Sequence, residues 1–94
     1  MTPEQMQAWE KFIGKEVVVD TTSNFLFIGT VHSVDACFLT LGLSDVHDRH
    51  ESSSSKEKYT MDSRKYGLKA DRKAVSIRLE NVVCLSLMED VIEY

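Results

Sequence analysis

The chain has 94 residues, of which 43% are hydrophobic and 28% are charged, a composition typical of soluble globular proteins. This length predicts a single domain over residues 1–94 that buries about 60 to 65% of its unfolded surface, which gives a small core. No apolar run approaches the roughly 20 residues of a membrane span, and no signal-peptide pattern opens the chain, so we expect a cytoplasmic protein with no membrane partner. The net charge of −4 argues against a simple nucleic-acid binder.

The first predicted element is a short amphipathic helix over residues 2–13. Thr2 can cap this helix, and Gln5 can reach back to complete a capping box. Trp9 and Ile13 recur at helical spacing, which indicates one apolar face. We therefore expect Trp9 to pack in the core rather than to stack on a ligand.

Three consecutive strands are predicted within residues 15–43. The β-branched run 17–19 disfavours a helix, and a second run covers residues 25–34. Gly29 stands in the middle of that second run, where glycine indicates a sharp bend. A third run, 37–43, follows immediately. Three antiparallel strands with a bent middle one are typical of a small, highly curved barrel.

Residues 44–73 form a long connection, which we expect to have structure of its own. A capping-box pattern at residues 54–57 predicts a helix over residues 55–66. The side chains expected on one face of that helix are Tyr59, Ser63 and Tyr66. A pair of extended strands carrying basic side chains is the alternative.

The same connection contains weak candidates for metal ligands. His47, Asp48 and His50 lie within four consecutive positions, and imidazole with carboxylate suits zinc or manganese. No second cluster in the sequence completes such a site, so a polar turn is the preferred interpretation. No nucleophile elbow, phosphate loop or Cys-x-x-Cys pattern is present, and we expect neither catalysis nor a cofactor.

Two closely spaced strands are predicted within residues 74–87, followed by a C-terminal tail at 88–94. They are joined by the tight turn 78–81. The segment 56–78, which includes the first of these two strands, carries eight of the eleven basic residues and only three acidic ones. Such a segment can attract phosphate or acidic protein surface, although solvated charge around a loop is the simpler interpretation.

Two stretches resemble the two sequence motifs of the Sm and Sm-like family, in its bacterial type. The run Ile77-Arg78-Leu79-Glu80-Asn81-Val82 is similar to the second motif, Ile-Arg-Gly-x-Asn-Val, with Leu79 at the glycine position. The stretch from Gly14 through Gly29 to Asp35 is similar to the first motif, with its valines, second glycine and aspartate at the family spacing.

The resemblance implies an all-β fold, a small five-stranded, strongly bent antiparallel Sm-like barrel with an N-terminal α-helix and a partly helical insertion. The alternation of apolar residues along the strands supplies candidates for its core. These candidates are Val17, Val19, Leu26, Ile28, Leu39, Leu41, Ile77, Val83 and Leu85.

The resemblance also implies self-assembly. In an Sm-like fold the fourth strand of one subunit pairs with the fifth strand of the next, and this head-to-tail pairing closes into a ring of about five to seven subunits. The implied interface residues are Val75, Ile77, Val83 and Leu85.

A single-stranded RNA site is implied near the two motifs. In RNA-binding relatives a base lies between a flat side chain after the first-motif aspartate and the basic residue of the second motif, while an asparagine reads its edge. The corresponding residues here are Asp35, Arg78 and, as the flat side chain, Cys37 or Phe38. Phe38 or Leu39 replaces the asparagine, which puts uridine selectivity in doubt. Further basic candidates for RNA contact are Lys69, Arg72 and Lys73.

Three hypotheses follow from the sequence. The first is a ring that binds RNA through Arg78 and the basic segment. The second is a non-catalytic oligomeric scaffold for protein contacts, with the insertion or the acidic tail as its docking surface. The third and weakest is a metal-dependent activity centred on His47 and His50.

Overall fold

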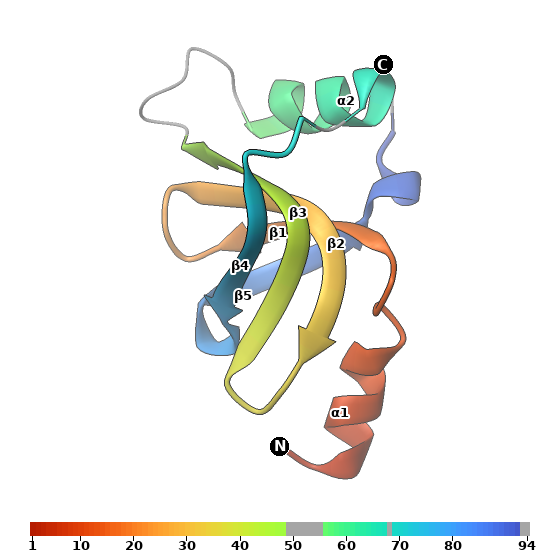
Figure 1. Cartoon of the computed structure of the whole chain (residues 1–94), viewed down its shortest axis with the longest axis vertical. Helices are drawn as coiled ribbons and strands as arrows, with labels where there is room; N and C mark the ends of the chain where they lie inside the picture. The colour runs from red at the N-terminus through yellow and green to blue at the C-terminus, as the bar shows by residue number, and fades with distance from the viewer. Residues whose placement is uncertain (49–55, 68, 93–94) are drawn as a thin grey trace.

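Five antiparallel strands form one strongly bent sheet in the order β4-β3-β2-β1-β5, preceded by one helix and capped by another (Figure 1). The computed structural model describes residues 1–48, 56–67 and 69–92. Its helices are α1 (Pro3–Glu10) and α2 (Lys56–Tyr66). Its strands are β1 (Glu16–Thr21), β2 (Phe25–Val34), β3 (Phe38–Asp48), β4 (Arg72–Arg78) and β5 (Val82–Leu87), with short 3-10 turns at Leu79–Asn81 and Met88–Asp90.

Helix α1 begins as predicted and ends earlier. The Gln5 backbone N–H donates to Thr2 Oγ1 at 3.1 Å and the Thr2 N–H donates to Gln5 Oε1 at 2.7 Å, which confirms the capping box. The predicted end at residue 13 is wrong, because the chain tightens after Glu10: the Ile13 N–H donates to the Glu10 carbonyl at 3.0 Å. Ile13 is consequently exposed, whereas Trp9 packs against the core.

Gly29 lies inside the tightest part of the bend, as the sequence predicted. A Cβ at this position would lie 3.1 Å from the Gly42 carbonyl oxygen and 3.1 Å from Ser44 Cβ. The pairing of β2 with β3 slips by one residue beside Gly29, and Leu43 takes a left-handed backbone conformation there, with φ of +46°. The absence of a side chain at Gly29 therefore lets β3 fold closely over β2.

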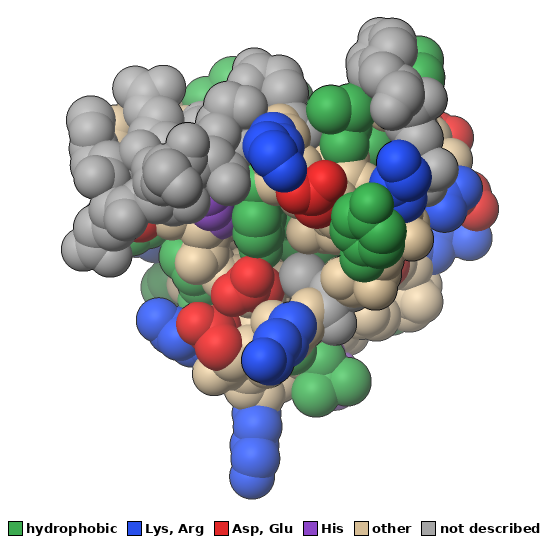
Figure 2. Space-filling model, turned by 90° about the horizontal axis from the view of Figure 1, so that it is seen from above, with side chains coloured by type: hydrophobic (Ala, Val, Ile, Leu, Met, Phe, Trp, Pro, Cys, Tyr) green, Lys and Arg blue, Asp and Glu red, His purple; other side chains and the backbone are tan. Residues whose placement is uncertain are grey.

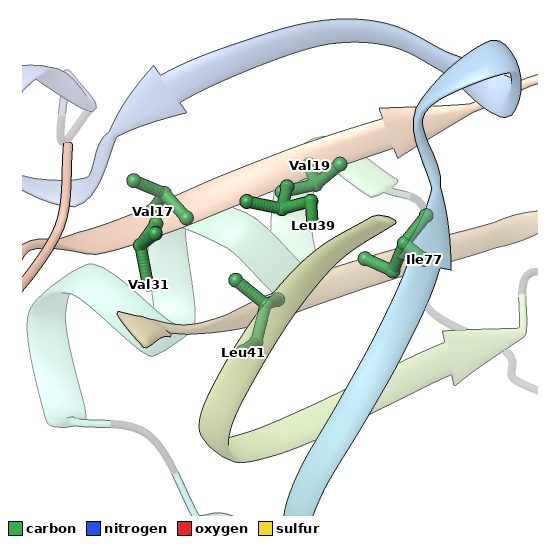
Figure 3. Close-up of a cluster of buried hydrophobic side chains, with 6 residues drawn as sticks. All are labelled: Val17, Val19, Val31, Leu39, Leu41 and Ile77. Carbon is green, nitrogen blue, oxygen red and sulfur yellow. The ribbon is translucent and has the colours of Figure 1, made fainter. Parts of the chain in front are cut away.

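A cluster of buried aliphatic side chains fills the barrel (Figure 3). Its members are Val17, Val19, Val31, Leu39, Leu41 and Ile77. A second cluster lies beneath α2 and the C-terminal turn. Its members are Val18, Leu26, Ile28 and Met88, with Tyr59 and Val91 packed against them. The core candidates of β1, β2, β3 and β4 are thus buried as predicted.

The prediction that Val83 belongs to the core is wrong. Thr21 pairs with Val82 and Asp20 pairs with Cys84, so Val83 is the extra residue of a β-bulge. The bulge turns its side chain outward and leaves it 65% exposed. Leu85 remains half-buried against the barrel core.

The predicted start of the insertion at residue 44 is also wrong, because β3 continues to Asp48. Ser44 is buried and its Oγ donates to the Ile28 carbonyl at 2.9 Å, so a residue typical of turns is accommodated inside the strand. Strand β4 correspondingly begins at Arg72 rather than residue 74.

Helix α2 confirms the helix predicted in the insertion rather than the alternative pair of strands. It spans Lys56–Tyr66, and the capping box predicted at residues 54–57 lies outside the part whose side chains the structure describes. Of the three side chains expected on one face, Tyr59 packs against the second cluster and Ser63 is buried, but Tyr66 is 76% exposed, because it stands at the last position of the helix. Neither described helix has the length and apolar character needed to cross a membrane.

Candidate nucleic-acid interface

The turns that carry the two motifs meet at the end of the barrel away from α2 (Figure 1). The Leu79 backbone N–H, in the turn between β4 and β5, donates to the Cys37 carbonyl in the turn between β2 and β3 at 2.9 Å. Phe38 and Arg78 are paired across β3 and β4. Residues that are about 40 positions apart in the sequence therefore form one local site.

Asp35 shapes the first of these turns. Its Oδ1 accepts the backbone N–H groups of Cys37 at 2.7 Å and Phe38 at 2.8 Å. These hydrogen bonds to the charged carboxylate lower the pKa of Asp35 below its usual value of 3.8. The Asp35 N–H also donates to the Phe38 carbonyl at 2.9 Å. Asp35 thus holds the backbone that presents Cys37 and Phe38.

A cavity of about 500 Å³ lies between the two turns. The residues that line it are Ala36, Cys37, Phe38, Arg78, Leu79 and Glu80. The Phe38 side chain is 41% exposed, so its ring is accessible from the cavity. Both residues proposed from the sequence for the flat side chain, Cys37 and Phe38, contribute to the lining.

Leu39 takes no part in this cavity, because its side chain is fully buried in the barrel core. The resemblance places the asparagine of RNA-binding relatives at Phe38 or Leu39, and neither side chain has a polar group that can read a base edge.

Glu80 is a site residue that the sequence analysis did not identify. Its Oε1 forms an ion pair with Nη2 of Arg78, and both side chains are mostly exposed at the cavity. In the sequence, only the position of Glu80, two residues after the motif arginine, could have indicated this role. The ion pair forms because the chain enters the 3-10 turn Leu79–Asn81 directly after β4.

The other basic candidates lie elsewhere. Lys69, Arg72 and Lys73 are exposed, but Arg72 pairs with Ser44 of β3 at the opposite end of β4 from Arg78, about 20 Å along the strand. Arg72 also forms an ion pair with Asp71 at 3.1 Å. Among the described residues, basic and acidic side chains are interspersed on the face that carries α2 (Figure 2).

The four interface candidates lie on the outer strands β4 and β5. Val83 is exposed, and Val75 and Leu85 are half-buried. Ile77 is buried in the core of its own chain, so only its backbone is available to a neighbouring copy.

The weak metal candidates are not arranged as a site within the described residues. His47 is buried and its ring stacks on Tyr59, with ring centroids 4.2 Å apart. No group of three or more potential ligands comes together in the described part of the chain. Asp48 is half-buried, and His50 lies outside the described residues.

Comparisons with known proteins identify the fold through structure rather than sequence. No family model and no curated protein matches the sequence. Among solved structures, the Sm protein of Pyrococcus abyssii in complex with a uridine heptamer matches with a TM-score of 0.59 at 17% identity, over 93% of this chain and 99% of that chain. The SmAP (LSm) protein of Methanococcus vannielii matches with a TM-score of 0.59 at 18% identity, over 92% and 97%.

A chain of the NatC complex bound to CoA also matches, with a TM-score of 0.54 at 22% identity over 82% of this chain and 79% of that one. Together with the strand order and the bend at Gly29, these similarities show that the chain has the Sm-like fold, as the two motifs predicted.

Proposed function

We propose that this protein is a ring-forming Sm-like protein of the cytoplasm that binds single-stranded RNA and carries out no catalysis. The observation that supports this most directly is the pairing of Phe38 with Arg78 at the cavity between the motif turns. The similar fold of a protein solved with a uridine heptamer adds support.

In this proposal one base enters the cavity of each subunit. The exposed Phe38 ring supplies a stacking surface, and the Arg78 guanidinium can stack on the base or contact a phosphate. A stacked base contributes about 1 to 3 kcal/mol, so a single cavity binds weakly. A ring presents several cavities to one RNA molecule. Once one base is bound, the effective concentration of the remaining bases at the other cavities is high, and this raises the overall affinity.

The two outer strands support assembly into a ring. In the described part of the chain, β4 and β5 each pair with only one strand of the sheet. Strand β4 begins with Arg72 and Lys73, whereas Glu89 and Asp90 lie in the 3-10 turn that follows β5. Antiparallel pairing of β4 with the next copy's β5 brings these opposite charges together, whereas β4 with β4 joins like charges. A head-to-tail ring is therefore preferred, and the resemblance to the Sm-like family implies about five to seven subunits.

The RNA proposal is tested with fluorescein-labelled RNA heptamers of uridine, adenosine and mixed sequence, measured by anisotropy at low and moderate salt. Phe38→Ala and Arg78→Ala should each weaken binding about tenfold or more. Lys65→Ala is the control for charge, because Lys65 lies in the last turn of α2, at the other end of the barrel from the cavity. Absence of salt-sensitive binding to every heptamer would reject the proposal.

The two exposed cysteines provide an independent readout of where RNA lies. Cys37 lines the cavity, whereas Cys84 lies on β5 beside Asp20, 3.5 Å from its carboxylate. Saturating RNA should slow thiol labelling of Cys37 in a Cys84→Ser variant. Labelling of Cys84 in a Cys37→Ser variant should not respond to RNA.

A protein scaffold remains the second candidate function. It is favoured by the ion pair between Arg78 and Glu80, which neutralises the motif arginine, and by the mixed charge of the α2 face. The similarity to a chain of the NatC complex, a multiprotein assembly, points the same way. Affinity purification with and without nuclease separates the two functions, since partners of a scaffold are retained after RNA is digested.

A further inference from the structure

The acidic residue of the cavity suggests which base it accepts, if the proposed RNA binding holds. Glu80 and Arg78 line the cavity side by side as an ion pair. An ionised carboxylate only accepts hydrogen bonds, and a guanidinium only donates them. The pair therefore presents acceptors and donors together at a cavity that also carries the Phe38 ring.

Other groups at the cavity add little to base discrimination. Ala36 and Leu79 have apolar side chains, and the Cys37 thiol is a weak donor and acceptor. Asp35 does not line the cavity, and its Oδ1 already accepts two backbone N–H groups of the turn. Hydrogen-bond discrimination between bases thus rests on Glu80 and Arg78.

Uracil fits this pair poorly. Its Watson–Crick edge presents two carbonyl oxygens on either side of a single N–H group, so a carboxylate facing that edge meets at least one oxygen and is repelled. An asparagine amide could satisfy both kinds of group, but the two candidates for that position, Phe38 and Leu39, have apolar side chains.

Guanine fits the pair well. Its N1–H and N2–H groups are adjacent donors that match the two oxygens of one carboxylate, and its O6 is an acceptor for a guanidinium. The ion pair leaves room for this, because a carboxylate has about four lone-pair sites and Arg78 has five N–H donors. Adenine and cytosine each offer one amino donor and a neighbouring acceptor, which is an intermediate match.

We infer that the cavity selects guanine over uracil, with Glu80 accepting from the N1–H and N2–H groups and Arg78 donating to O6. This inference rests on the proposed RNA binding and adds the identity of the preferred base. Glu80 rejects uracil and accepts the two guanine N–H groups, Arg78 adds the hydrogen bond to O6, and the Phe38 ring supplies stacking affinity for any base.

The test uses uridine heptamers in which only the central position varies: guanosine, inosine, adenosine, cytidine or uridine. A single guanosine per strand avoids four-stranded guanine structures. We expect guanosine to bind about tenfold or more tightly than uridine, since a bidentate pair discriminates by about 1 to 3 kcal/mol. Inosine, which lacks the N2 amino group, should fall between them.

Glu80→Gln should reduce the guanosine-to-uridine ratio several-fold. Glu10→Gln is the control, because it removes the same charge from an exposed residue at the end of α1, outside the cavity. The ratio is the informative quantity, since both substitutions strengthen phosphate attraction for all heptamers alike.

Uridine binding as tight as guanosine binding would overturn the inference while leaving the proposed RNA binding intact. An unchanged ratio in Glu80→Gln would overturn the role of Glu80. Failure of every heptamer to bind would instead reject the proposed function, and the inference with it.

Discussion

His47 and Tyr59 lie face to face, with ring centroids 4.2 Å apart and an angle of 14° between the ring planes. The Tyr59 hydroxyl also donates to Asp45 Oδ2 at 2.5 Å. Burial, followed by this hydrogen bond to a carboxylate, raises the pKa of Tyr59 well above its usual value. One side chain of α2 thus makes two contacts with β3, directly above the second hydrophobic cluster.

The first prediction concerns this attachment. Tyr59→Phe keeps the stacked ring and removes the hydroxyl, so it should lower the free energy of unfolding by about 1 kcal/mol. Tyr59→Ala should lower it by about 2 kcal/mol or more, because the stacking and the cover over the cluster are lost as well. Urea unfolding followed by circular dichroism measures both. Tyr66→Phe, at an exposed ring, should change nothing, and equal effects at Tyr59 and Tyr66 would contradict the assignment.

The second prediction concerns the bend. Gly29→Ala should destabilise the protein by about 1 to 3 kcal/mol, because the added Cβ would lie 3.1 Å from both the Gly42 carbonyl oxygen and Ser44 Cβ. Gly42→Ala is the matched control on the facing strand, where the nearest atom to an added Cβ is the Lys73 carbonyl oxygen at 3.9 Å. Thermal unfolding compares the two variants. Equal losses would show that crowding at Gly29 does not set the bend.

The third prediction is a pH dependence at Asp35. Because its folded pKa lies below the usual 3.8, the carboxylate stabilises the folded protein at pH values above 3.8, and this stabilisation is lost as the pH falls through the folded pKa. Asp35→Asn keeps an oxygen acceptor and removes the charge. The variant should be less stable than the natural protein at neutral pH, and the difference in urea midpoint should shrink below pH 3.8. A difference that stays constant down to pH 2 would exclude this role for the charge.

The fourth prediction tests the head-to-tail interface. The double variant Arg72→Glu with Lys73→Glu should weaken assembly about tenfold or more per contact, because in the proposed ring like charges then face Glu89 and Asp90 of the next copy. Glu89→Lys with Asp90→Lys should weaken it equally. Native mass spectrometry of the two variants mixed together should recover rings that contain both variants, because a contact between unlike variants restores opposite charges. Rings that form equally well in all three samples would show that other contacts carry the interface.

Local features of the sequence predicted most of the fold. The apolar alternation of the strands, the glycine of the bend and the Thr2 cap each act within a few residues, so their outcome could be predicted without the tertiary structure. Val83 could not be assigned correctly, since its direction depends on a register slip between strands that are distant in the sequence. Ser44 was misinterpreted for a similar reason, because its hydroxyl is satisfied by the Ile28 carbonyl across the sheet.

The candidate site was predicted in part. Asp35, Cys37, Phe38 and Arg78 followed from the motif resemblance, and the structure brings them to the same pair of turns. The contribution of Glu80 depends on the ion pair that the turn after β4 creates. Arg78 and Arg72 are far apart because they stand at opposite ends of the extended strand β4. Counting charges along the sequence does not reveal this separation.

The pairing of Val17 with Leu87 joins the first strand to the last. Pairing neighbouring strands in a hairpin brings together residues that are close in the sequence. Pairing Val17 with Leu87 brings together residues separated by most of the chain, so it costs more conformational entropy. Refolding should therefore end with the docking of β5, and until that step the free side of β1 can pair with another unfolded molecule. Yields of refolded protein should accordingly fall as its concentration rises, even under conditions in which the finished barrel is stable.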